Sequence, residues 1–315
     1  MKPVKNRSMK SYLLNLDTQR SYSSREGEHL KILNFLDKDG PAGGVLLGDT
    51  LYPFAELSKI SDVFKSFQIT DDVIASNADQ NDIDMIVEES KSKLRGRPIA
   101  TTKILAPVLR SGKILCIGVN YMEHAKESRQ KVMEHPTIFC KFQDSIIGNM
   151  DDITVPKDAK QIDYEGELVV IIGRSSGTAE SSIFGYTIGN DVSARDLQFR
   201  TSQWLLGKAL PTFAPIGPVI VGKNELGFAR DLQIITRVNG TVRQNGNTSD
   251  MIFDVRAIVD YLSGYFNLGP GDIIFTGTPE GVILGLPENE RVWLKHGDVI
   301  DVSITGIGTL TNRIN

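Results

Sequence analysis

Short apolar runs separated by glycine- and aspartate-containing turns dominate the hydrophobic pattern of this chain, and runs of this length predict β-strands. Three of them predict a small N-terminal sheet; they cover residues 12–16, 30–36 and 43–52. Five more predict strands further along; they cover residues 165–172, 186–191, 272–276, 291–294 and 299–304. A turn at 295–298 would join the last two as a hairpin. The pattern therefore indicates a sheet-rich protein.

Helical signals are fewer. Residues 57–96 are more charged and favour helix, and the segment 91–98 contains basic residues and helix breakers that mark a linker or surface turn. Apolar residues recur at helical spacing over 250–266, which predicts one amphipathic helix. A chain of 315 residues exceeds the usual size of one domain. We therefore predict a mixed α+β protein with a small N-terminal domain, residues 1–105, and a larger domain, residues 106–315.

Three carboxylates lie at the ends of two predicted strands, where one cation could bind them all. Side chains alternate between the faces of a strand, so Glu165 and Glu167 would project from the same side about 7 Å apart. Asp191 ends the next strand, just before Ser193-Ala-Arg-Asp196, which is typical of a capped helix start. The alternative is a solvated pair on an edge strand, but an apolar run follows Glu167, and buried carboxylates are costly without a cation or hydrogen-bond partners. Three oxygen ligands without Cys or His suit Mg²⁺ or Mn²⁺, or else Ca²⁺, better than Zn²⁺.

Composition and charge narrow the functional classes. The formal net charge is −4 and the isoelectric point is about 5.7, so the chain lacks the basic field that nucleic-acid binding needs. No apolar run approaches the roughly 20 residues of a membrane helix, and residues 1–7 are not followed by an adequate secretory signal. Cys116 and Cys140 are the two cysteines, which favours a reducing compartment. We expect a cytoplasmic protein without nucleic-acid or membrane partners.

His124 and Glu127 are the most suggestive ionisable pair outside the acidic cluster. Asn120 and Glu123 resemble a capped helix start, which would place His124 and Glu127 on one face within hydrogen-bonding reach. A carboxylate paired with imidazole raises its basicity and fixes its tautomer, as a water-activating base requires. By spacing alone, a surface pair on a helix is the simpler explanation.

Five further polar side chains are candidates for substrate contacts. Lys208 lies among apolar residues and could hold a carboxylate or a developing enolate charge. Arg195 is either a surface residue or a carboxylate clamp, and Gln198 lies three residues later. Thr278 falls in a glycine-rich turn after a strand, where a hydroxyl and backbone amides can approach a carboxylate closely. Lys141 is a further candidate.

Five blocks of the sequence together resemble the fumarylacetoacetate hydrolase family. They are residues 106–121, 163–167, 190–196, 207–218 and 271–281. Their order and spacing make the resemblance specific, and it covers the chain from about residue 106 to the C-terminus. The resemblance implies a β-roll or barrel for the larger domain, a homodimer, and a lid over the metal that carries His124 as base and Glu127 as its orienting partner. It also favours a substrate role for Lys208.

The activity implied by this resemblance is metal-dependent chemistry on a small 2-oxo or 2,4-dioxo acid. We expect a hydrolase that cleaves a carbon–carbon bond of an acylpyruvate or fumarylpyruvate, with water activated by His124 and pyruvate leaving as its enolate. Pure isomerases of the family can dispense with the His–Glu pair, so its presence favours hydrolysis. An oxaloacetate decarboxylase and a 2-hydroxymuconate-type isomerase or hydratase are alternatives on the same site. The third alternative is a catalytically silent protein that binds a keto acid.

Overall fold

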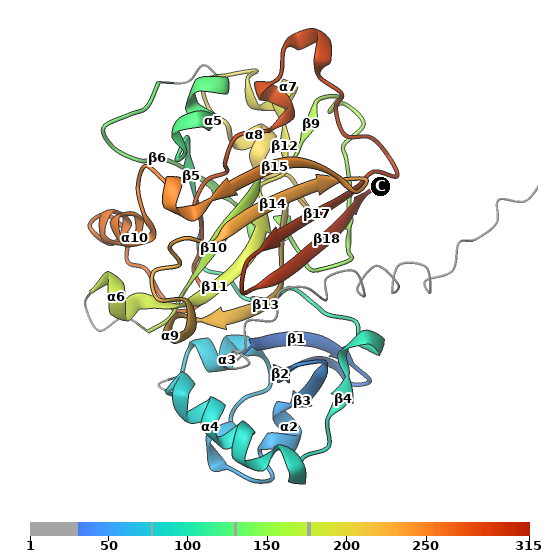
Figure 1. Cartoon of the computed structure of the whole chain (residues 1–315), viewed down its shortest axis with the longest axis vertical. Helices are drawn as coiled ribbons and strands as arrows, with labels where there is room; N and C mark the ends of the chain where they lie inside the picture. The colour runs from blue at the N-terminus through green and yellow to red at the C-terminus, as the bar shows by residue number, and fades with distance from the viewer. Residues whose placement is uncertain (1–30, 77, 129–130, 175–177) are drawn as a thin grey trace, which may run out of the picture.

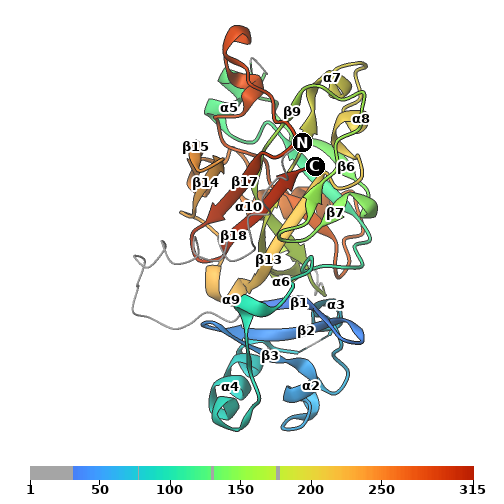
Figure 2. The ribbon, with the colours of Figure 1, turned by 90° about the vertical axis from the view of Figure 1, so that its right-hand side faces the viewer.

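The computed structural model describes residues 31–76, 78–128, 131–174 and 178–315, which form a smaller lower lobe and a larger upper lobe (Figure 1). The strand predicted at 12–16 lies outside these residues. A view from the side shows the same two lobes, with β1 and β2 of the smaller lobe directly beneath β13 and α9 of the larger one (Figure 2).

The smaller lobe is an antiparallel sheet packed against short helices. Its strands are β1 (Lys31–Asp37), β2 (Gly40–Leu47), β3 (Thr50–Pro53) and β4 (Arg97–Pro98), and its α-helices are α2 (Phe54–Leu57), α3 (Thr70–Ile74) and α4 (Gln80–Ser90). The single strand predicted at 43–52 is two strands, because Gly48 adopts a positive φ of 51° and the chain turns there. The region 57–96 is helical only in short segments, and the predicted turn after α4 contains a 3₁₀ helix and β4.

One large sheet runs through both lobes in the order β4-β3-β2-β1-β13-β11-β10-β16-β5-β6, with β7 paired to β13. Its strands in the upper lobe are β5 (Ile114–Gly118), β6 (Thr137–Lys141), β7 (Ile146–Ile147), β10 (Gly166–Ile172), β11 (Ile183–Asn190), β13 (Ala214–Gly222) and β16 (Ile273–Phe275). β1 pairs antiparallel with β13, with Ile32 opposite Ile220. The division after residue 105 stays a prediction, since strands from both sides of it are hydrogen-bonded neighbours.

The central strand β10 explains where the hydrophobic core lies. All seven of its residues are buried, and its apolar residues 168–172 alternate between two apolar clusters on the two faces of the sheet. Leu168 and Val170 belong to one cluster, whereas Val169 and Ile171 belong to the other. An apolar run without polar alternation is the sequence signature of such a strand.

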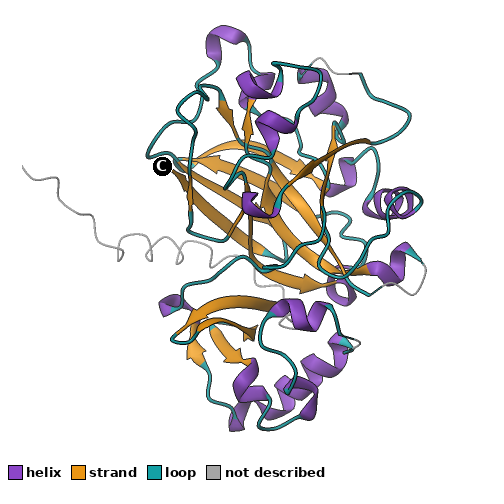
Figure 3. Cartoon of the chain, turned by 180° about the vertical axis from the view of Figure 1, so that it is seen from behind, coloured by secondary structure: helices purple, strands orange, loops and turns teal. Residues whose placement is uncertain are grey.

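A second sheet packs on this framework. Its strands, in spatial order, are β15 (Thr241–Asn247), β14 (Gln233–Val238), β17 (Val299–Ile304), β18 (Gly308–Ile314) and β8 (Asp152–Ile153). A two-stranded pair, β9 (Ile162–Asp163) with β12 (Ser193–Ala194), lies beside it. Within the described ranges the strands do not close into a barrel, and Figure 3 shows them as open layers with helices at the periphery. The expected sheet-rich mixed fold is confirmed.

The helices of the upper lobe are short. They are α5 (Met122–Glu127), α6 (Ala179–Ser182), α7 (Arg195–Gln198), α8 (Leu205–Lys208), α9 (Lys223–Leu226) and α10 (Val255–Ser263). The helix predicted over 250–266 begins later, at Val255, because the Asp254 side chain accepts a hydrogen bond from Ala257 N and caps it there. In the described part of the chain no helix has the length and apolar character to cross a membrane.

The strand predicted at 291–294 is wrong. Only Leu294 in that segment forms a β-bridge, to Ile162, and the remainder is irregular. The turn expected at 295–298 does precede β17, and His296 is exposed there. Val292 and Leu294, on either side of Trp293, gave this segment the apolar pattern of a strand. The segment instead contacts β9 through the bridge of Leu294.

Candidate functional site

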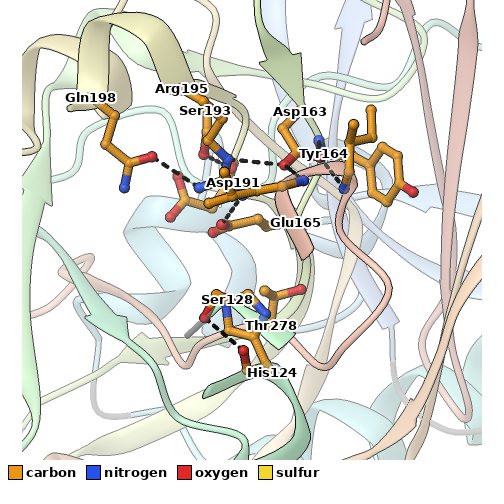
Figure 4. Close-up of polar contacts among 12 residues, drawn as sticks. His124, Ser128, Asp163, Tyr164, Glu165, Asp191, Ser193, Arg195, Gln198 and Thr278 are labelled. Carbon is orange, nitrogen blue, oxygen red and sulfur yellow. Dashed lines mark hydrogen bonds and ion pairs between the residues drawn. The ribbon is translucent and has the colours of Figure 1, made fainter. Parts of the chain in front are cut away.

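Three buried carboxylates meet where β10 begins and β11 ends. The two strands are antiparallel, with Gly166 opposite Asn190. Glu165 and Glu167, the chain neighbours of Gly166, therefore lie close to Asp191, the chain neighbour of Asn190. One carboxylate oxygen from each of the three acids lies within 4.8 Å of the others. Figure 4 shows Glu165 and Asp191 side by side, with His124 on the opposite side of the space before them. The structure thus brings together the three residues expected to bind a metal ion.

Gly166 allows the two glutamates to share a face. A Cβ atom at this position would lie 2.2 Å from Thr236 Oγ1 and 3.0 Å from Val302 Cγ1, both on the second sheet. The face opposite the glutamates therefore has room only for hydrogen. Close packing of the two sheets here fixes the direction in which both carboxylates point.

Two cationic side chains hold the first of these carboxylates. Arg195 Nη2 donates to Glu165 Oε1 at 2.6 Å, and Lys208 Nζ donates to Glu165 Oε2 at 2.6 Å. Lys208 Nζ also donates to Asp191 Oδ2 at 2.8 Å. These charge-assisted contacts order the carboxylates before any ligand binds.

Lys141 lies behind Asp191. Its Nζ is 2.6 Å from Asp191 Oδ1 and donates to three backbone carbonyls, those of Val192 at 3.2 Å, Phe213 at 2.8 Å and Lys208. The side chain is fully buried. The ammonium group is thus surrounded by protein acceptors, a position suited to supporting Asp191.

Charge and burial set the protonation of the cluster. Burial raises the pKa of Glu167 well above its ordinary value of 4.5, and the neighbouring charges of Asp191 and Glu165 raise it further. Burial also acts to raise the pKa of Glu165, but the charges of Lys208 and Arg195 outweigh burial and lower it. The site therefore favours a carboxylate at Glu165 and a protonated carboxyl at Glu167 unless a further cation is present.

This difference predicts a pH-dependent response to metal. Because its pKa is raised, Glu167 holds its proton more tightly in the folded chain than in the unfolded chain. Without metal, the free energy of unfolding should therefore fall as the pH rises from 4.5 to the raised pKa. A divalent cation requires the carboxylate form, so the increase in Tm caused by Mg²⁺ should grow over the same range. Thermal unfolding with chelator and with Mg²⁺, from about pH 5 to about pH 9, tests this. An increase in Tm that is independent of pH would contradict it.

Asp163 organises the site although sequence reasoning gave it no role. Its Oδ2 accepts from Arg195 Nε at 2.9 Å, while its two oxygens accept from the backbone N–H groups of Ile283 at 2.9 Å and Leu284 at 3.0 Å. Asp163 is fully buried. Strand alternation could have identified it, because it precedes Glu165 by two residues as Glu165 precedes Glu167.

The expected helix cap at Ser193-Ala-Arg-Asp196 is wrong. Ser193 pairs with Asp163 in the β9–β12 ladder, and Ala194 is the residue that precedes α7. Asp196 instead accepts from the backbone N–H groups of Lys160 and Gln161. Ser193 is thus used in strand pairing and Asp196 in a contact with a loop, so neither caps a helix. Arg195, between them, faces the interior.

His124 and Glu127 form the expected pair on α5. His124 Nδ1 lies 2.9 Å from Glu127 Oε1, and both oxygens of Glu127 accept from Gly281 N, at 3.1 and 3.0 Å. A Cβ atom at position 285 would lie 2.5 Å from Glu127 Cδ, so Gly285 gives the carboxylate room. His124 is buried, and its imidazole is among the groups that lower the pKa of Glu165. The pair therefore adjoins the acidic cluster.

Asn120 has a different role from the predicted cap. Tyr121 precedes α5, while the Asn120 amide donates to the carbonyls of Phe253 at 3.0 Å and Thr276 at 2.7 Å and accepts from Phe253 N at 2.8 Å. Val119, the preceding residue, has a φ of 58°, which is strained for a β-branched residue. These three hydrogen bonds hold the strained entry to α5 against two distant segments.

Replacing Asn120 with alanine should therefore lower the free energy of unfolding by about 3 kcal/mol, because three backbone groups, one buried and two partly buried, lose a partner. Urea unfolding measures the change. Asn245→Ala is the matched control, since the Asn245 side chain is exposed and its hydrogen bond to Gln233 lies at the surface, so its effect should stay within about 0.5 kcal/mol. Equal effects of the two substitutions would contradict this role of Asn120.

The other predicted substrate contacts lie at the same site. Gln198 Oε1 accepts from Arg195 Nη1 at 2.9 Å, so the amide helps to fix the guanidinium. Thr278 is buried near His124 (Figure 4), but its hydroxyl donates to Gly166 O at 2.9 Å and accepts from Gln244 at 2.8 Å. The first contact ties the glycine-rich turn to the start of β10, and the second ties it to β15.

The residues present fit a divalent cation. The donors are three carboxylates that lie close enough to share one ion, they are buried, and the ammonium of Lys208 already bridges two of them as a positive charge would. Carboxylate oxygens without thiolate or imidazole are ligands for a hard cation. Among the described residues, this is the cluster of three or more His, Cys, Asp or Glu side chains with metal-binding geometry.

Comparisons with known proteins identify the family to which this chain is similar. The family model described as fumarylacetoacetate (FAA) hydrolase C-terminal matches residues 113–315. The fumarylacetoacetate hydrolase domain-containing protein 2 homolog of Dictyostelium discoideum is 46% identical over 232 residues, which are 69% of this chain and 75% of that protein. A human protein named oxaloacetate tautomerase FAHD2A, mitochondrial, is 40% identical over 224 residues, which are 69% of this chain and 71% of the relative.

Solved structures extend the similarity to the smaller lobe. The fumarylacetoacetate hydrolase of Exiguobacterium antarcticum has a TM-score of 0.76 and 36% identity, over 91% of this chain and 99% of the other. The 5-carboxymethyl-2-hydroxymuconate delta-isomerase of Mycobacterium smegmatis has a TM-score of 0.70 and 34% identity, over 90% and 98%. The family resemblance in the sequence is thereby confirmed. This chain is an enzyme of the fumarylacetoacetate hydrolase family.

Proposed function

We propose that this enzyme catalyses keto–enol interconversion of a small 2-oxo dicarboxylic acid, with oxaloacetate as the first substrate to test. The observation that carries the proposal is the His124–Glu127 pair placed beside a buried three-carboxylate cluster. The names of the relatives support it, because several are called oxaloacetate tautomerases and others isomerases. The sequence favoured hydrolysis, which none of these tautomerase or isomerase names indicates.

A bound Mg²⁺ or Mn²⁺ at Glu165, Glu167 and Asp191 would withdraw electrons from the 2-oxo group and make the hydrogens on C3 more acidic. Glu127 engages Nδ1 of His124, which leaves Nε2 to exchange a proton with the substrate. His124 takes a proton from C3, and Glu127 stabilises the resulting imidazolium. The same nitrogen then returns the proton to the oxygen of the 2-oxo group. One C–H bond breaks, one O–H bond forms, and no other reactant is consumed.

Neighbouring side chains would position the substrate rather than react with it. Lys208 carries a positive charge beside the acidic cluster. From this position it would bind a carboxylate group of the substrate. Arg195 and Gln198 would act mainly by fixing Glu165, because their polar groups already engage one another and the cluster. Thr278 would shape the turn that faces His124. Lys141 would support Asp191.

Hydrolysis of a 2,4-dioxo acid is the second candidate, because the same buried base pair could activate water instead of a C–H bond. In that reaction His124 would take a proton from water, the water oxygen would bond to the distal carbonyl carbon, and the carbon–carbon bond would break to release pyruvate and a free acid. Decarboxylation of oxaloacetate needs the cation but no attacking water, so it uses His124 least. These reactions differ in their products.

The products decide between them. Enol oxaloacetate is added to enzyme with Mg²⁺ or with chelator; its conversion to the keto form is followed by ultraviolet absorbance, and the products are identified by NMR. We expect metal-dependent conversion at least about 100-fold above buffer, with no pyruvate. Pyruvate and carbon dioxide would identify a decarboxylase instead, and pyruvate plus acid from a parallel acylpyruvate reaction would identify a hydrolase. Metal binding without turnover of either compound would leave a keto-acid binder.

Assembly and location are proposed from the sequence. Phe142, Phe199 and Leu206 are 51%, 49% and 51% exposed, and large apolar side chains at the surface support a homodimer. Light scattering on the purified protein measures its mass. The cytoplasm is the proposed location, although the names of the human and other animal relatives include the word mitochondrial. Fractionation of the source cells distinguishes the two compartments.

A further inference from the structure

Every oxygen of two expected metal ligands already contacts a cation. Glu165 Oε1 contacts Arg195 and Oε2 contacts Lys208, whereas Asp191 Oδ1 contacts Lys141 and Oδ2 contacts Lys208. Lys208 Nζ thus bridges both acids, at 2.6 and 2.8 Å, where an ion shared by the cluster would also bind. A divalent cation must therefore share these oxygens or displace one of the three side chains.

The three cations differ in how firmly they are held. Arg195 is also fixed by Asp163 and Gln198, at 2.9 Å each. Lys141 donates to three backbone carbonyls besides its contact with Asp191. Removing either from the cluster would break several other hydrogen bonds within the buried interior.

Lys208 is held almost entirely by the two ligands themselves. Within the part of the chain that the structure describes, the ammonium also lies over the ring of Phe139, whose centroid is 5.0 Å from Nζ. A lysine side chain has four rotatable carbon bonds and can move its ammonium without moving the backbone. Lys208 lies at the end of the four-residue helix α8.

We propose that Lys208 and the metal ion exchange at this cluster: the ammonium holds Glu165 and Asp191 in place until the metal binds, and metal binding releases it toward the substrate. The site contains four buried carboxylates, those of Asp163 and the three acids, against the cations of Arg195, Lys141 and Lys208. With all seven groups ionised the site carries one net negative charge. A divalent cation reverses the sign.

This exchange explains how one site can attract first a cation and then an anion. Before metal binds, the three cations do not outnumber the carboxylates, even when Glu167 holds a proton, so the site has no excess positive charge to attract an anionic substrate. Afterwards, the site is positive and the released ammonium is available to a substrate carboxylate. The metal would therefore bind before the substrate. The step toward substrate rests on the proposed function, whereas the exchange itself concerns only the protein and the metal.

Metal titration of two lysine variants tests the exchange. Lys208→Met removes a competitor, so the Kd for Mn²⁺ measured by calorimetry should fall by about tenfold, while the Tm in chelator should also fall because the carboxylates repel one another. Lys141→Met is the matched control: it removes the other buried lysine on Asp191, and it should raise the Kd for Mn²⁺ because Asp191 loses its support. The two substitutions are thus expected to change metal affinity in opposite directions.

A second variant and a direct measurement guard against misfolding of Lys208→Met. Lys208→Gln keeps a hydrogen-bond donor without the charge and should also lower the Kd. In crystals soaked with Mn²⁺, Nζ should lie beyond hydrogen-bonding distance of Glu165 and Asp191. An unchanged or raised Kd in both Lys208 variants, or a lysine that still bridges both acids beside bound Mn²⁺, would overturn the exchange. These readouts do not depend on turnover, so failure of the proposed reaction would be seen separately.

Discussion

His124→Asn is expected to lower kcat by about 10² to 10⁴-fold while leaving the Kd for Mg²⁺ nearly unchanged. The reason is that the imidazole is the group proposed to carry a proton, whereas the proposed metal ligands lie on other segments of the chain. Asparagine retains a polar side chain that can hydrogen-bond to Glu127, so the helix should remain in place. Steady-state kinetics with oxaloacetate and calorimetry with Mg²⁺ give the two quantities.

Glu127→Gln is the control for this prediction. Glutamine keeps an oxygen that can accept from Gly281 N but removes the charge that would stabilise a protonated His124. The expected loss in kcat is smaller than for His124→Asn, about 10-fold, with a shift in the pH profile toward lower pH. Without the carboxylate the imidazolium is less stable, so the imidazole loses its proton at lower pH and is a weaker base. If His124→Asn retained more than about a tenth of the activity, His124 would not be the base.

Glu167→Gln should make the protein without metal more stable and also inactive. Burial and the charges of Asp191 and Glu165 disfavour a carboxylate here, and a neutral amide removes that repulsion while still accepting from Gly277 N, now at 2.7 Å from Glu167 Oε2. We expect a higher Tm in chelator at pH 8, loss of the Mg²⁺-induced increase in Tm, and activity reduced by more than about 10³-fold. Thermal unfolding with and without Mg²⁺, beside activity assays, measures all three.

The conservative substitution Glu167→Asp separates charge from geometry. Aspartate keeps the negative charge but is shorter by one methylene group, so it should not raise the Tm in chelator and should weaken Mg²⁺ binding only partly. A lower Tm for Glu167→Gln in chelator would show that the carboxylate stabilises the fold instead. That result would contradict the view that the Glu167 carboxylate destabilises the fold until a cation binds.

Periodicity located the candidate metal ligands Glu165 and Glu167, because it depends only on neighbouring residues. Alternation along a strand places Glu165 and Glu167 on one face, and the apolar run of β10 shows that this strand is buried. The spacing of His124 and Glu127 similarly placed both on one side of a helical turn. The same reasoning failed at Ser193 and Asn120, because capping motifs describe local contacts. Ser193 pairs through its strand with distant Asp163, and the Asn120 side chain has distant partners.

The sequence by itself therefore determined the family, the sheet-rich fold and the chemical types gathered at the site. Only the tertiary structure decided which cation serves which acid: Lys141 and Lys208 are both buried beside Asp191, but one is enclosed by backbone carbonyls and the other bridges two ligands. It likewise revealed Asp163 as the link between Arg195 and the segment that supports Glu127. The physical reason is that periodicity fixes the face on which a side chain lies, whereas the partner it meets depends on strand pairing between segments far apart in the chain.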